Sequence, residues 1–288
     1  MSYLDALIQP RPLEELRACF EQDQPFVVHG KRDSLAELFA IPFLASLDRL
    51  LGMWPEQVQV HLPDVADEAS SIAASPHDAR KLFANGMGLL FEDVNRYAPV
   101  LDSWLAGIRG QLGLSRLTNQ RSLMYATPAN KGTAPHFDQN VNFVLQVHGT
   151  KRWSIAPNVN VMRPLTRHTM GLAVDPELQS YAELPMPLEM PSGAVDYVLE
   201  PGSILFVPRG AWHCTHAVTD ALSLNFTFSA PTWLDVFGAA LRSRLALSSE
   251  WRETAAPSAV ETFDVLLRQL AADVTNWNAT DILEATEG

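Results

Sequence analysis

Short runs of alternating hydrophobic and polar residues fill the middle of the chain and predict β-strands, because successive side chains of a strand point to opposite faces. Gly and Pro turns separate these runs. The clearest strands are predicted at the following ranges: 25–30, 57–62, 87–93, 122–127, 133–147, 151–157, 203–207, 212–218 and 222–229. Many short strands with such turns indicate a double-sheet jelly roll.

Helical spacing of apolar residues dominates both ends of the chain. LEELRACF (13–20) and APVLDSWLAGIRGQLGL (98–114) predict helices beside the strands. FGAALRSRLALSS and VETFDVLLRQLAADVTNW predict helices in the tail, and such an apolar stripe is usually core or a dimer seam. The expected fold class is therefore mainly β with surrounding helices. We expect one domain over 1–235 and a C-terminal helical region over 236–288.

Two segments are predicted to lack regular structure. Residues 63–75, PDVADEASSIAAS, are polar and have the composition of an exposed loop. Residues 156–191 are rich in Pro and carry Arg163, Arg167 and His168. A loop this long in a compact domain is usually functional or mobile. The second segment is thus a candidate substrate lid.

Composition excludes several classes of protein. The chain has 288 residues, 47% of them hydrophobic, and a formal net charge of −12. That charge disfavours nucleic-acid binding, which needs a basic surface. Apolar runs fall short of about 18 residues and the start lacks a signal-peptide pattern, so we expect a cytoplasmic protein without membrane spans. Cys19 and Cys214 are too few for a disulfide scaffold and are interpreted as reduced core thiols.

A His-x-Asp pair opens the stretch with the most chemistry. His136 and Asp138 lie two apart in a predicted strand, so their side chains share a face, about 7 Å apart along the strand. An imidazole and a carboxylate suit non-haem Fe(II) if a second His joins them, because this set of three ligands leaves coordination positions of the metal open. His213, in GAWHCTHAV, is the candidate, and parity separates it from His216 unless the strand carries a bulge.

Polar residues extend the face of this pair. Continuing the same parity places Asn142 and Gln146 beside Asp138, while their apolar neighbours face a packing layer. His148, Gly149 and Thr150 predict a turn, and KRWSIAP (151–157) predicts the returning antiparallel strand. Lys151 would then begin a strand next to the metal face, where its ammonium could meet an anionic ligand.

The motifs carry a resemblance to a known family. HFDQNVNFVLQVHGTKRW (136–153) resembles the central motif of JmjC/cupin-type Fe(II)- and 2-oxoglutarate-dependent oxygenases, among them the asparaginyl hydroxylase of hypoxia-inducible factor and the ribosomal-protein oxygenases. PFVVHG (25–30) and NGMGLLFEDVNRYAPVLDSWL (85–105) resemble the leading elements of that family. The resemblance implies a double-stranded β-helix core, the cupin jelly roll.

The same resemblance implies roles for seven residues. His136, Asp138 and His213 would hold the iron. Lys151 and Thr133 would bind the distal carboxylate of the co-substrate 2-oxoglutarate, and a Lys suits this task as a point charge. The implied residues beside co-substrate and iron are Asn142 and Asn225. Thr227 departs from the bulky aromatic residue of the asparaginyl hydroxylase, and the tail is too short for the winged-helix domain of the ribosomal oxygenases.

The expected activity is hydroxylation of a peptide or protein side chain, or of an amino-acid-like substrate, with O2 consumed and succinate and CO2 released. Related oxygenases dimerise through C-terminal helices, so a homodimer is expected too. A non-catalytic cupin that binds metal or ligand is the alternative. Lys151 favours the enzyme, since a binding module needs no cation for 2-oxoglutarate. A zinc isomerase fits less well because cupin isomerases usually use more histidines.

Overall fold

The computed structural model describes residues 2–62 and 70–287 and divides into two compact units. The first unit comprises the chain up to Gly113 together with Asn119–Ser229, and the second comprises Leu114–Thr118 and the chain from Ala230 onward. Each unit is described by itself. The first contains all the strands and all the predicted site residues.

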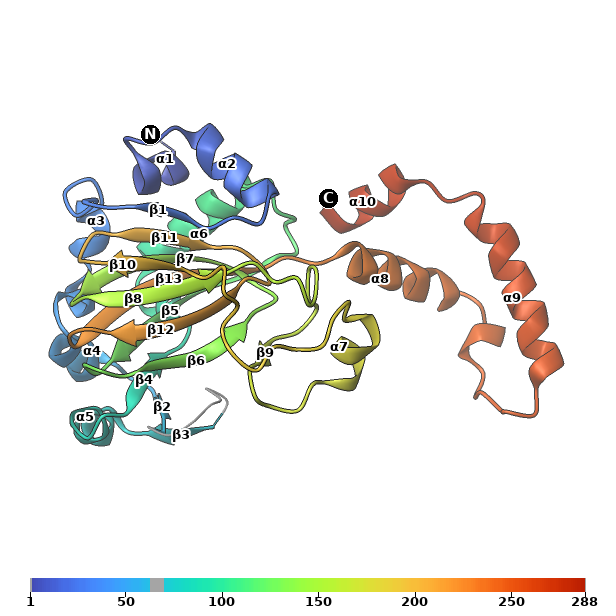
Figure 1. The fold of residues 1–288 in the computed structure, drawn as a ribbon. Helices are drawn as coiled ribbons and strands as arrows, with labels where there is room; N and C mark the ends of the chain where they lie inside the picture. The colour runs from blue at the N-terminus through green and yellow to red at the C-terminus, as the bar shows by residue number, and fades with distance from the viewer. Residues whose placement is uncertain (1, 63–69, 288) are drawn as a thin grey trace. The chain divides into compact units, whose positions relative to one another are not determined.

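Two antiparallel sheets face each other in the first unit (Figure 1). The larger has the strand order β1-β11-β7-β13-β5-β4-β2-β3, and the smaller has the order β10-β8-β12-β6-β9. The strands are β1 (Phe26–Val28), β2 (Val58–His61), β3 (Ser71–Ala74), β4 (Gly88–Phe91), β5 (Asn119–Thr127), β6 (Gly132–Phe137), β7 (Val141–His148), β8 (Lys151–Ala156), β9 (His168–Thr169), β10 (Val195–Leu199), β11 (Ile204–Val207), β12 (Trp212–Ala217) and β13 (Ala221–Ser229). The jelly-roll prediction is confirmed.

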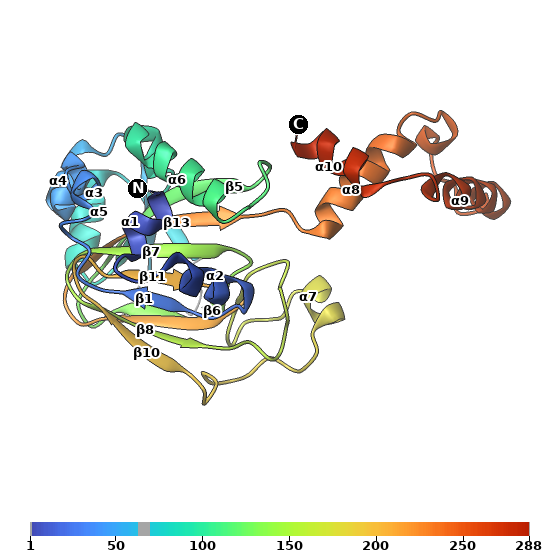
Figure 2. The same cartoon turned by 90° about the horizontal axis from the view of Figure 1, so that it is seen from above.

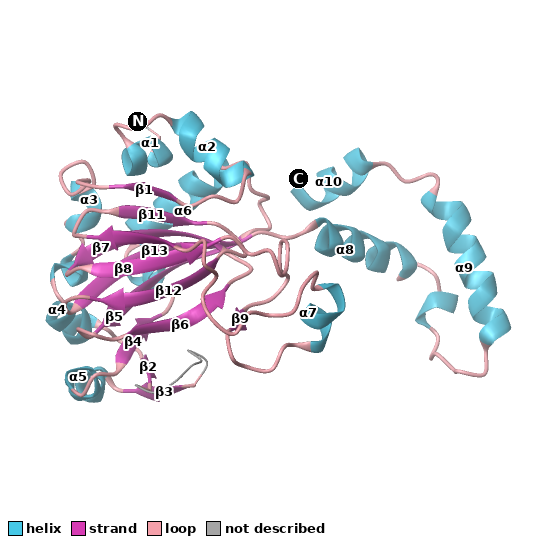
Figure 3. Cartoon of the chain, in the orientation of Figure 1, coloured by secondary structure: helices cyan, strands magenta, loops and turns pink. Residues whose placement is uncertain are grey.

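Helices surround this core and form most of the tail (Figure 3). They are α1 (Tyr3–Ile8), α2 (Leu13–Glu21), α3 (Ala36–Phe39), η1 (Pro42–Ala45), α4 (Leu47–Met53), α5 (Pro76–Ala84), η2 (Val94–Tyr97), α6 (Pro99–Gln111), α7 (Pro176–Tyr181), α8 (Trp233–Leu245), η3 (Glu250–Arg252), α9 (Val260–Val274) and α10 (Ala279–Glu287). None of the helices in the described ranges is both long and apolar enough to cross a membrane.

Helices α1, α2 and α6 lie beside the larger sheet (Figure 2). Aromatic contacts fix them there: Trp104 of α6 stacks on Phe226 of β13 at 6.3 Å, and Phe20 of α2 packs on Phe206 of β11 at 6.0 Å. The two sheets pack on each other through one cluster of buried side chains. The larger sheet contributes Val144, Leu205 and Val207, and the smaller sheet contributes Trp153, Ile155 and Leu199. Ala211, just before β12, completes the cluster. The core therefore supports both sheets around the site.

The predicted hairpin of 141–157 is wrong. β7 pairs with β11 and β13 in the larger sheet, whereas β8 pairs with β10 and β12 in the smaller one. The Gly149 turn therefore carries the chain from one sheet to the other. The continuous strand predicted over 133–147 is likewise two strands, β6 and β7, which lie in different sheets. Local sequence pattern predicted the strands but not their partners.

Two loop predictions also need correction. Residues 71–74 form β3, which pairs with β2, while 63–69 lie outside the described residues. The 156–191 segment is not irregular throughout, because it contains β9 and α7. It also has a packed core in which Val161, Met170 and Leu178 lie against Phe137 and Trp212. The segment is thus a folded part of the first unit.

The second unit is held together by polar and aromatic contacts between α8 and α9. Arg244 donates two hydrogen bonds of 2.8 Å to the carboxylate of Asp273, and Trp277 donates a third of 3.1 Å. The Arg244 bonds, followed by that of Trp277, lower the pKa of Asp273 to about 2. Phe237 packs on Trp277 at 5.9 Å. Most of the apolar side chains of these helices nevertheless remain exposed within the described chain.

Candidate active site

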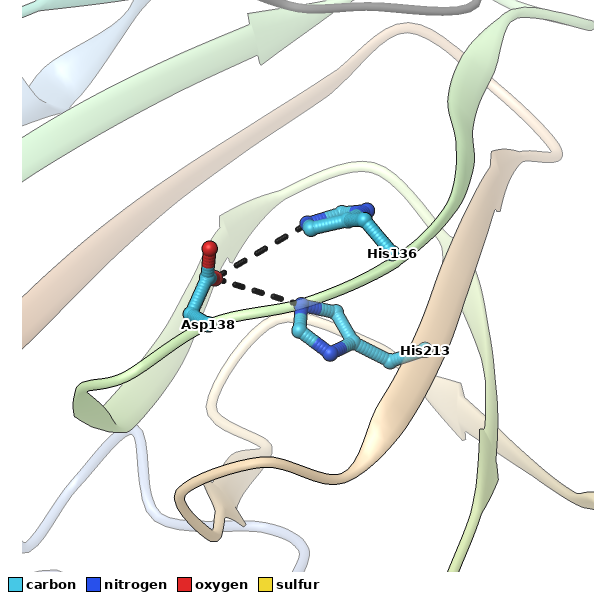
Figure 4. Close-up of side chains that lie close together, drawn as sticks. All are labelled: His136, Asp138 and His213. Atoms are coloured by element: carbon cyan, nitrogen blue, oxygen red, sulfur yellow. Dashed lines mark ion pairs between the residues drawn. The ribbon is translucent and has the colours of Figure 1, made fainter. Parts of the chain in front are cut away.

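Neighbouring strands of the smaller sheet bring the two histidines together. His136 of β6 and His213 of β12 are direct partners in the antiparallel register, and the register shifts beyond His213. Asp138 follows β6 immediately, where the chain leaves the sheet toward β7. The three side chains converge on one point (Figure 4). Their potential ligand atoms all lie within 4.8 Å of one another, and His216 is outside this cluster.

One carboxylate oxygen faces both rings. Asp138 Oδ2 lies 3.8 Å from His136 Nε2 and 3.6 Å from His213 Nε2 (Figure 4). Both histidines are buried, whereas the Asp138 side chain is 20% exposed. The cluster therefore opens toward a cavity on the side of the carboxylate. A metal ion held there would retain positions for further ligands.

Backbone carbonyls fix the orientation of the imidazoles. His136 Nδ1 donates to Ala134 O at 2.8 Å, and His213 Nδ1 donates to Ala211 O at 2.9 Å. Because a carbonyl only accepts, these bonds assign the proton of each neutral ring to Nδ1 and direct the Nε2 lone pair toward Asp138. Hydrogen bonds of this kind orient metal-ligating histidines in proteins. The rings are therefore prepared for a cation before it arrives.

Two more side chains restrain the cluster. Trp153 stacks on the ring of His213, with centroids 5.8 Å apart. Arg167 Nε lies 3.7 Å from Asp138 Oδ1, the carboxylate oxygen that faces away from the imidazoles. Arg167 belongs to the 156–191 segment, and no spacing in the sequence signals that it meets Asp138. The segment therefore contributes a cation to the site.

Lys151 is the buried cation of the cavity. It begins β8, is 4% exposed, and donates from Nζ to Thr127 Oγ1 at 3.0 Å. Its ammonium also lies 5.6 Å from the centroid of the Trp153 ring. A buried ammonium is costly without an anionic or polar partner. The position therefore suits the carboxylate of a ligand that also reaches the histidines.

Hydroxyl and amide groups complete the lining. Thr133 Oγ1 lies 3.0 Å from Thr215 Oγ1, and Thr227 donates to Asn142 Oδ1 at 2.6 Å. Asn225 Oδ1 is buried and has no hydrogen-bond partner within the described chain. Ser223 Oγ is likewise buried and has no hydrogen-bond partner within the described chain. Such unsatisfied buried groups are rare in proteins and point to a partner that the chain itself does not supply.

A cavity of about 220 Å³ joins these residues, and we call it the metal-side cavity. All seven predicted site residues line it: Thr133, His136, Asp138, Asn142, Lys151, His213 and Asn225. Gln146, predicted on the same face, is not among them. It lies four residues further along β7 than Asn142, is fully buried, and donates to His148 O and Leu222 O.

Sequence reasoning missed the contribution of β5. Arg121, Leu123 and Tyr125 line the metal-side cavity from this strand. They are alternate residues of one strand, so the period of two was the signal that could have found them. Together with Lys151 they extend the polar wall opposite the histidines.

The residues present fit a divalent iron and a keto dicarboxylate. Two neutral imidazoles and one carboxylate are the facial donor set of non-haem Fe(II) oxygenases. The buried ammonium of Lys151 offers a hydrogen-bond donor to a small anion, and the unsatisfied amide oxygen of Asn225, in the same cavity, offers an acceptor to a ligand that carries a donor. Fold and site together define a metal-binding double-stranded β-helix protein.

Comparison with known proteins gives the family. The sequence profile described as "JmjC domain" matches residues 111–236. The uncharacterized protein YxbC of Bacillus subtilis is 30% identical over 260 residues, which cover 88% of this chain and 79% of that protein. The chain belongs to the JmjC-domain family.

Named relatives are longer than this chain. Ribosomal oxygenase 1 of Rattus norvegicus is 32% identical over 173 residues, covering 58% of this chain and 26% of that protein. The bifunctional lysine-specific demethylase and histidyl-hydroxylase NO66 of Culex quinquefasciatus is 26% identical over 256 residues, covering 83% of this chain and 36% of that protein. The matched regions thus span about a quarter to about a third of these two relatives.

The fold has solved counterparts. YcfD, a ribosomal oxygenase from Escherichia coli solved in complex with cobalt and 2-oxoglutarate, superposes with a TM-score of 0.58 at 18% identity, covering 93% of this chain and 68% of that one. This likeness shows a shared fold. It agrees with the jelly roll expected from the strand pattern.

Proposed function

We propose that the protein is an Fe(II)- and 2-oxoglutarate-dependent oxygenase that hydroxylates a side chain of a protein substrate. The reaction is 2-oxoglutarate + O2 + R–H → succinate + CO2 + R–OH. One oxygen atom enters succinate and the other enters the new hydroxyl group. The bound iron supplies the oxidative chemistry, and the chain supplies binding, orientation and exclusion of water.

One observation carries the proposal: a buried lysine and a His-Asp-His cluster line the same cavity. A protein that only bound metal would need the cluster alone. 2-Oxoglutarate needs both, because its keto acid end binds the metal while its distal carboxylate needs a cation. Lys151 supplies that cation at the opposite end of the cavity from Asp138.

The other residues have positioning roles in this proposal. Thr133 donates its hydroxyl to the distal carboxylate beside Lys151. Asn142 and Asn225 line the same cavity and hydrogen-bond the co-substrate or the ligands of the iron. Arg167 holds Asp138 Oδ1, which leaves Oδ2 toward the metal. Trp153 packs on His213 and excludes water from one side of the ring.

A protein substrate is favoured over a free amino acid by the relatives, whose names specify ribosomal oxygenases and a histidyl-hydroxylase. YcfD, which shares the fold, was solved with cobalt and 2-oxoglutarate, the metal and co-substrate types proposed here. Hydroxylation, rather than demethylation, is the activity we propose. Thr227, a small side chain, lines the metal-side cavity in which the substrate side chain would lie.

Calorimetry tests this function. Titration of Fe(II), without oxygen, followed by 2-oxoglutarate should give two ordered binding events in the wild type. His136→Ala and Asp138→Ala should abolish the first event, whereas His216→Ala, in the same strand as His213 but outside the cluster, should retain both. Metal binding without any 2-oxoglutarate binding would support the non-catalytic cupin instead.

Three further features are part of the proposal. First, the chain divides into an oxygenase domain over 1–235 and a helical region over 236–288. A homodimer through the C-terminal helices is supported by the exposure of their apolar side chains, among them Phe263 at 54%. A cytoplasmic location is supported by two free cysteines, which suit a reducing compartment.

A further inference from the structure

A second cavity meets the metal-side cavity at Lys151. It has a volume of about 330 Å³, within the range of about 300–1,000 Å³ that is typical of small-ligand cavities. The two cavities share Tyr125, Thr133 and Lys151. None of the three metal ligands lines the second cavity. It therefore reaches the lysine without passing the cluster, and we call it the rear cavity.

The ammonium of Lys151 lies at the partition between the cavities. It donates a hydrogen bond to Thr127, which lines the rear cavity and not the metal-side cavity. A carboxylate bound to Lys151 from the metal side would therefore lie next to the rear cavity. Lys151 is therefore one of the three residues at which the two spaces meet.

The charge of the rear cavity suits a dicarboxylate. Its lining within the described chain contains Lys131, Lys151 and His61 and no carboxylate, although the whole protein carries 33 acidic and 21 basic side chains. Lys131 is exposed and lines the rear cavity but not the metal-side cavity. Local positive charge in an acidic protein raises the association rate of an anion.

The metal-side cavity has a competing occupant. In the proposed function, on which this inference rests, the side chain to be hydroxylated must lie above the cluster. A bound protein substrate would then cover that cavity while succinate is still held behind it. A separate passage at Lys151 removes this conflict.

We propose that 2-oxoglutarate enters and succinate leaves through the rear cavity, guided by Lys131 and passed across Lys151, and not through the metal-side cavity.

A pair of charge reversals tests the passage. Lys131→Glu alters the rear cavity alone, and Arg121→Glu makes the same charge change at a side chain that lines only the metal-side cavity. The probe is N-oxalylglycine, a non-reactive analogue of 2-oxoglutarate, mixed with the Mn(II)-loaded full chain. The quenching of tryptophan fluorescence, with Trp153 beside the site, reports the binding rates.

Lys131→Glu should lower the association rate at least about threefold at low salt, because steering by charge changes on-rates by about tenfold or more. Arg121→Glu should leave that rate near the wild-type value. The difference should shrink at 1 M salt, where the Debye length is about 3 Å. The proposal would be overturned if the Arg121→Glu variant bound N-oxalylglycine slowly while the Lys131→Glu variant bound it at the wild-type rate.

A steric block gives an independent test. Gly88, in β4, lines the rear cavity, and a Cβ built there meets its nearest atoms at 3.7–3.9 Å, which is ordinary contact. Gly88→Leu should slow association and dissociation equally, each at least about tenfold, as a barrier higher by about 1.4 kcal/mol does. Kd should stay unchanged, since a passage alters rates and a site alters affinity.

Unchanged rates in Gly88→Leu, with the variant folded as judged by its melting temperature, would overturn the passage. An increased Kd with an unchanged association rate would do the same, because it would make the rear cavity part of the site. If the wild type binds no analogue at all, the proposed function fails together with this inference. Binding with wild-type rates in all rear-cavity variants refutes the inference alone.

Discussion

At the scale of single residues, Lys151 distinguishes an oxygenase site from a plain metal site. Lys151→Ala should weaken 2-oxoglutarate binding about 10- to 100-fold, because a hydrogen bond to a charged group contributes about 1.5–3 kcal/mol. Fe(II) affinity should change little. Calorimetry of both ligands checks this, with Lys131→Ala, an exposed lysine, as the control. Equal loss of iron and co-substrate would contradict the assigned role.

The two thiols allow a prediction about pH. Burial is the largest cause that raises the pKa of Cys19 and of Cys214. Both side chains are only half-buried, so the prediction that they are core residues was wrong. A raised thiol pKa means less thiolate at a given pH. Iodoacetamide at pH 8 should therefore modify both more slowly than free cysteine, with the rate rising above pH 9. Mass spectrometry of timed samples checks it, and faster modification would contradict the burial argument.

The pair His136 and Asp138 was predictable from the sequence because its geometry is local. His136 and Asp138 are two residues apart, and parity alone separated His213 from His216. Tyr125 was predictable in the same way but was not recognised, since its strand carries no distinctive motif. Arg167 was not predictable, because the fold of the 156–191 segment decides its distance to Asp138.

At the scale of elements, the turn between β7 and β8 positions Lys151, the residue that we propose to bind 2-oxoglutarate. Gly149 has a φ of +68°, and a Cβ there would lie 1.9 Å from Asp220 O. Gly149→Ala should cost about 3 kcal/mol or more in the free energy of unfolding and should weaken 2-oxoglutarate binding. Urea denaturation measures the first effect and calorimetry the second.

Gly113 provides the matched control for this turn. Its φ is +70°, and a Cβ there would meet no atom within 4 Å. Gly113→Ala should therefore cost only the strain of a left-handed residue, about 1–2 kcal/mol, and should leave co-substrate binding unchanged. Equal effects of the two substitutions would mean that the close approach to Asp220 does not matter.

Strand identity was predictable from the sequence, whereas strand pairing was not. Alternation depends on the two faces of each strand, so it identified β7 and β8 separately. The Gly149 turn has the composition of a hairpin, yet it crosses between sheets because β8 packs against β12 and β10. Pairing of this kind depends on contacts far apart in the sequence, which a local pattern does not contain.

At the scale of the whole molecule, the apolar stripe of α9 is the expected dimer seam. Val260, Phe263 and Leu267 are exposed at 62%, 54% and 43%. The sequence predicted the stripe correctly but not whether the chain itself would cover it. Sedimentation of the wild type should give a dimer, and the double variant Phe263→Glu, Leu267→Glu should give a monomer. Glu261→Gln, on another face of α9, is the control, and a monomeric wild type would contradict the proposal.

Formation of succinate from 2-oxoglutarate tests the central claim most directly. The Fe(II)-loaded protein, with O2 and proteins from a cell extract, should release succinate and CO2 in equal amounts. His213→Ala should abolish the release, Lys151→Ala should abolish it at a 2-oxoglutarate concentration near the wild-type Kd, and His216→Ala should leave it unchanged. If the wild type forms no more succinate than His213→Ala and calorimetry also shows no binding of 2-oxoglutarate, the protein is a binding module and not an oxygenase.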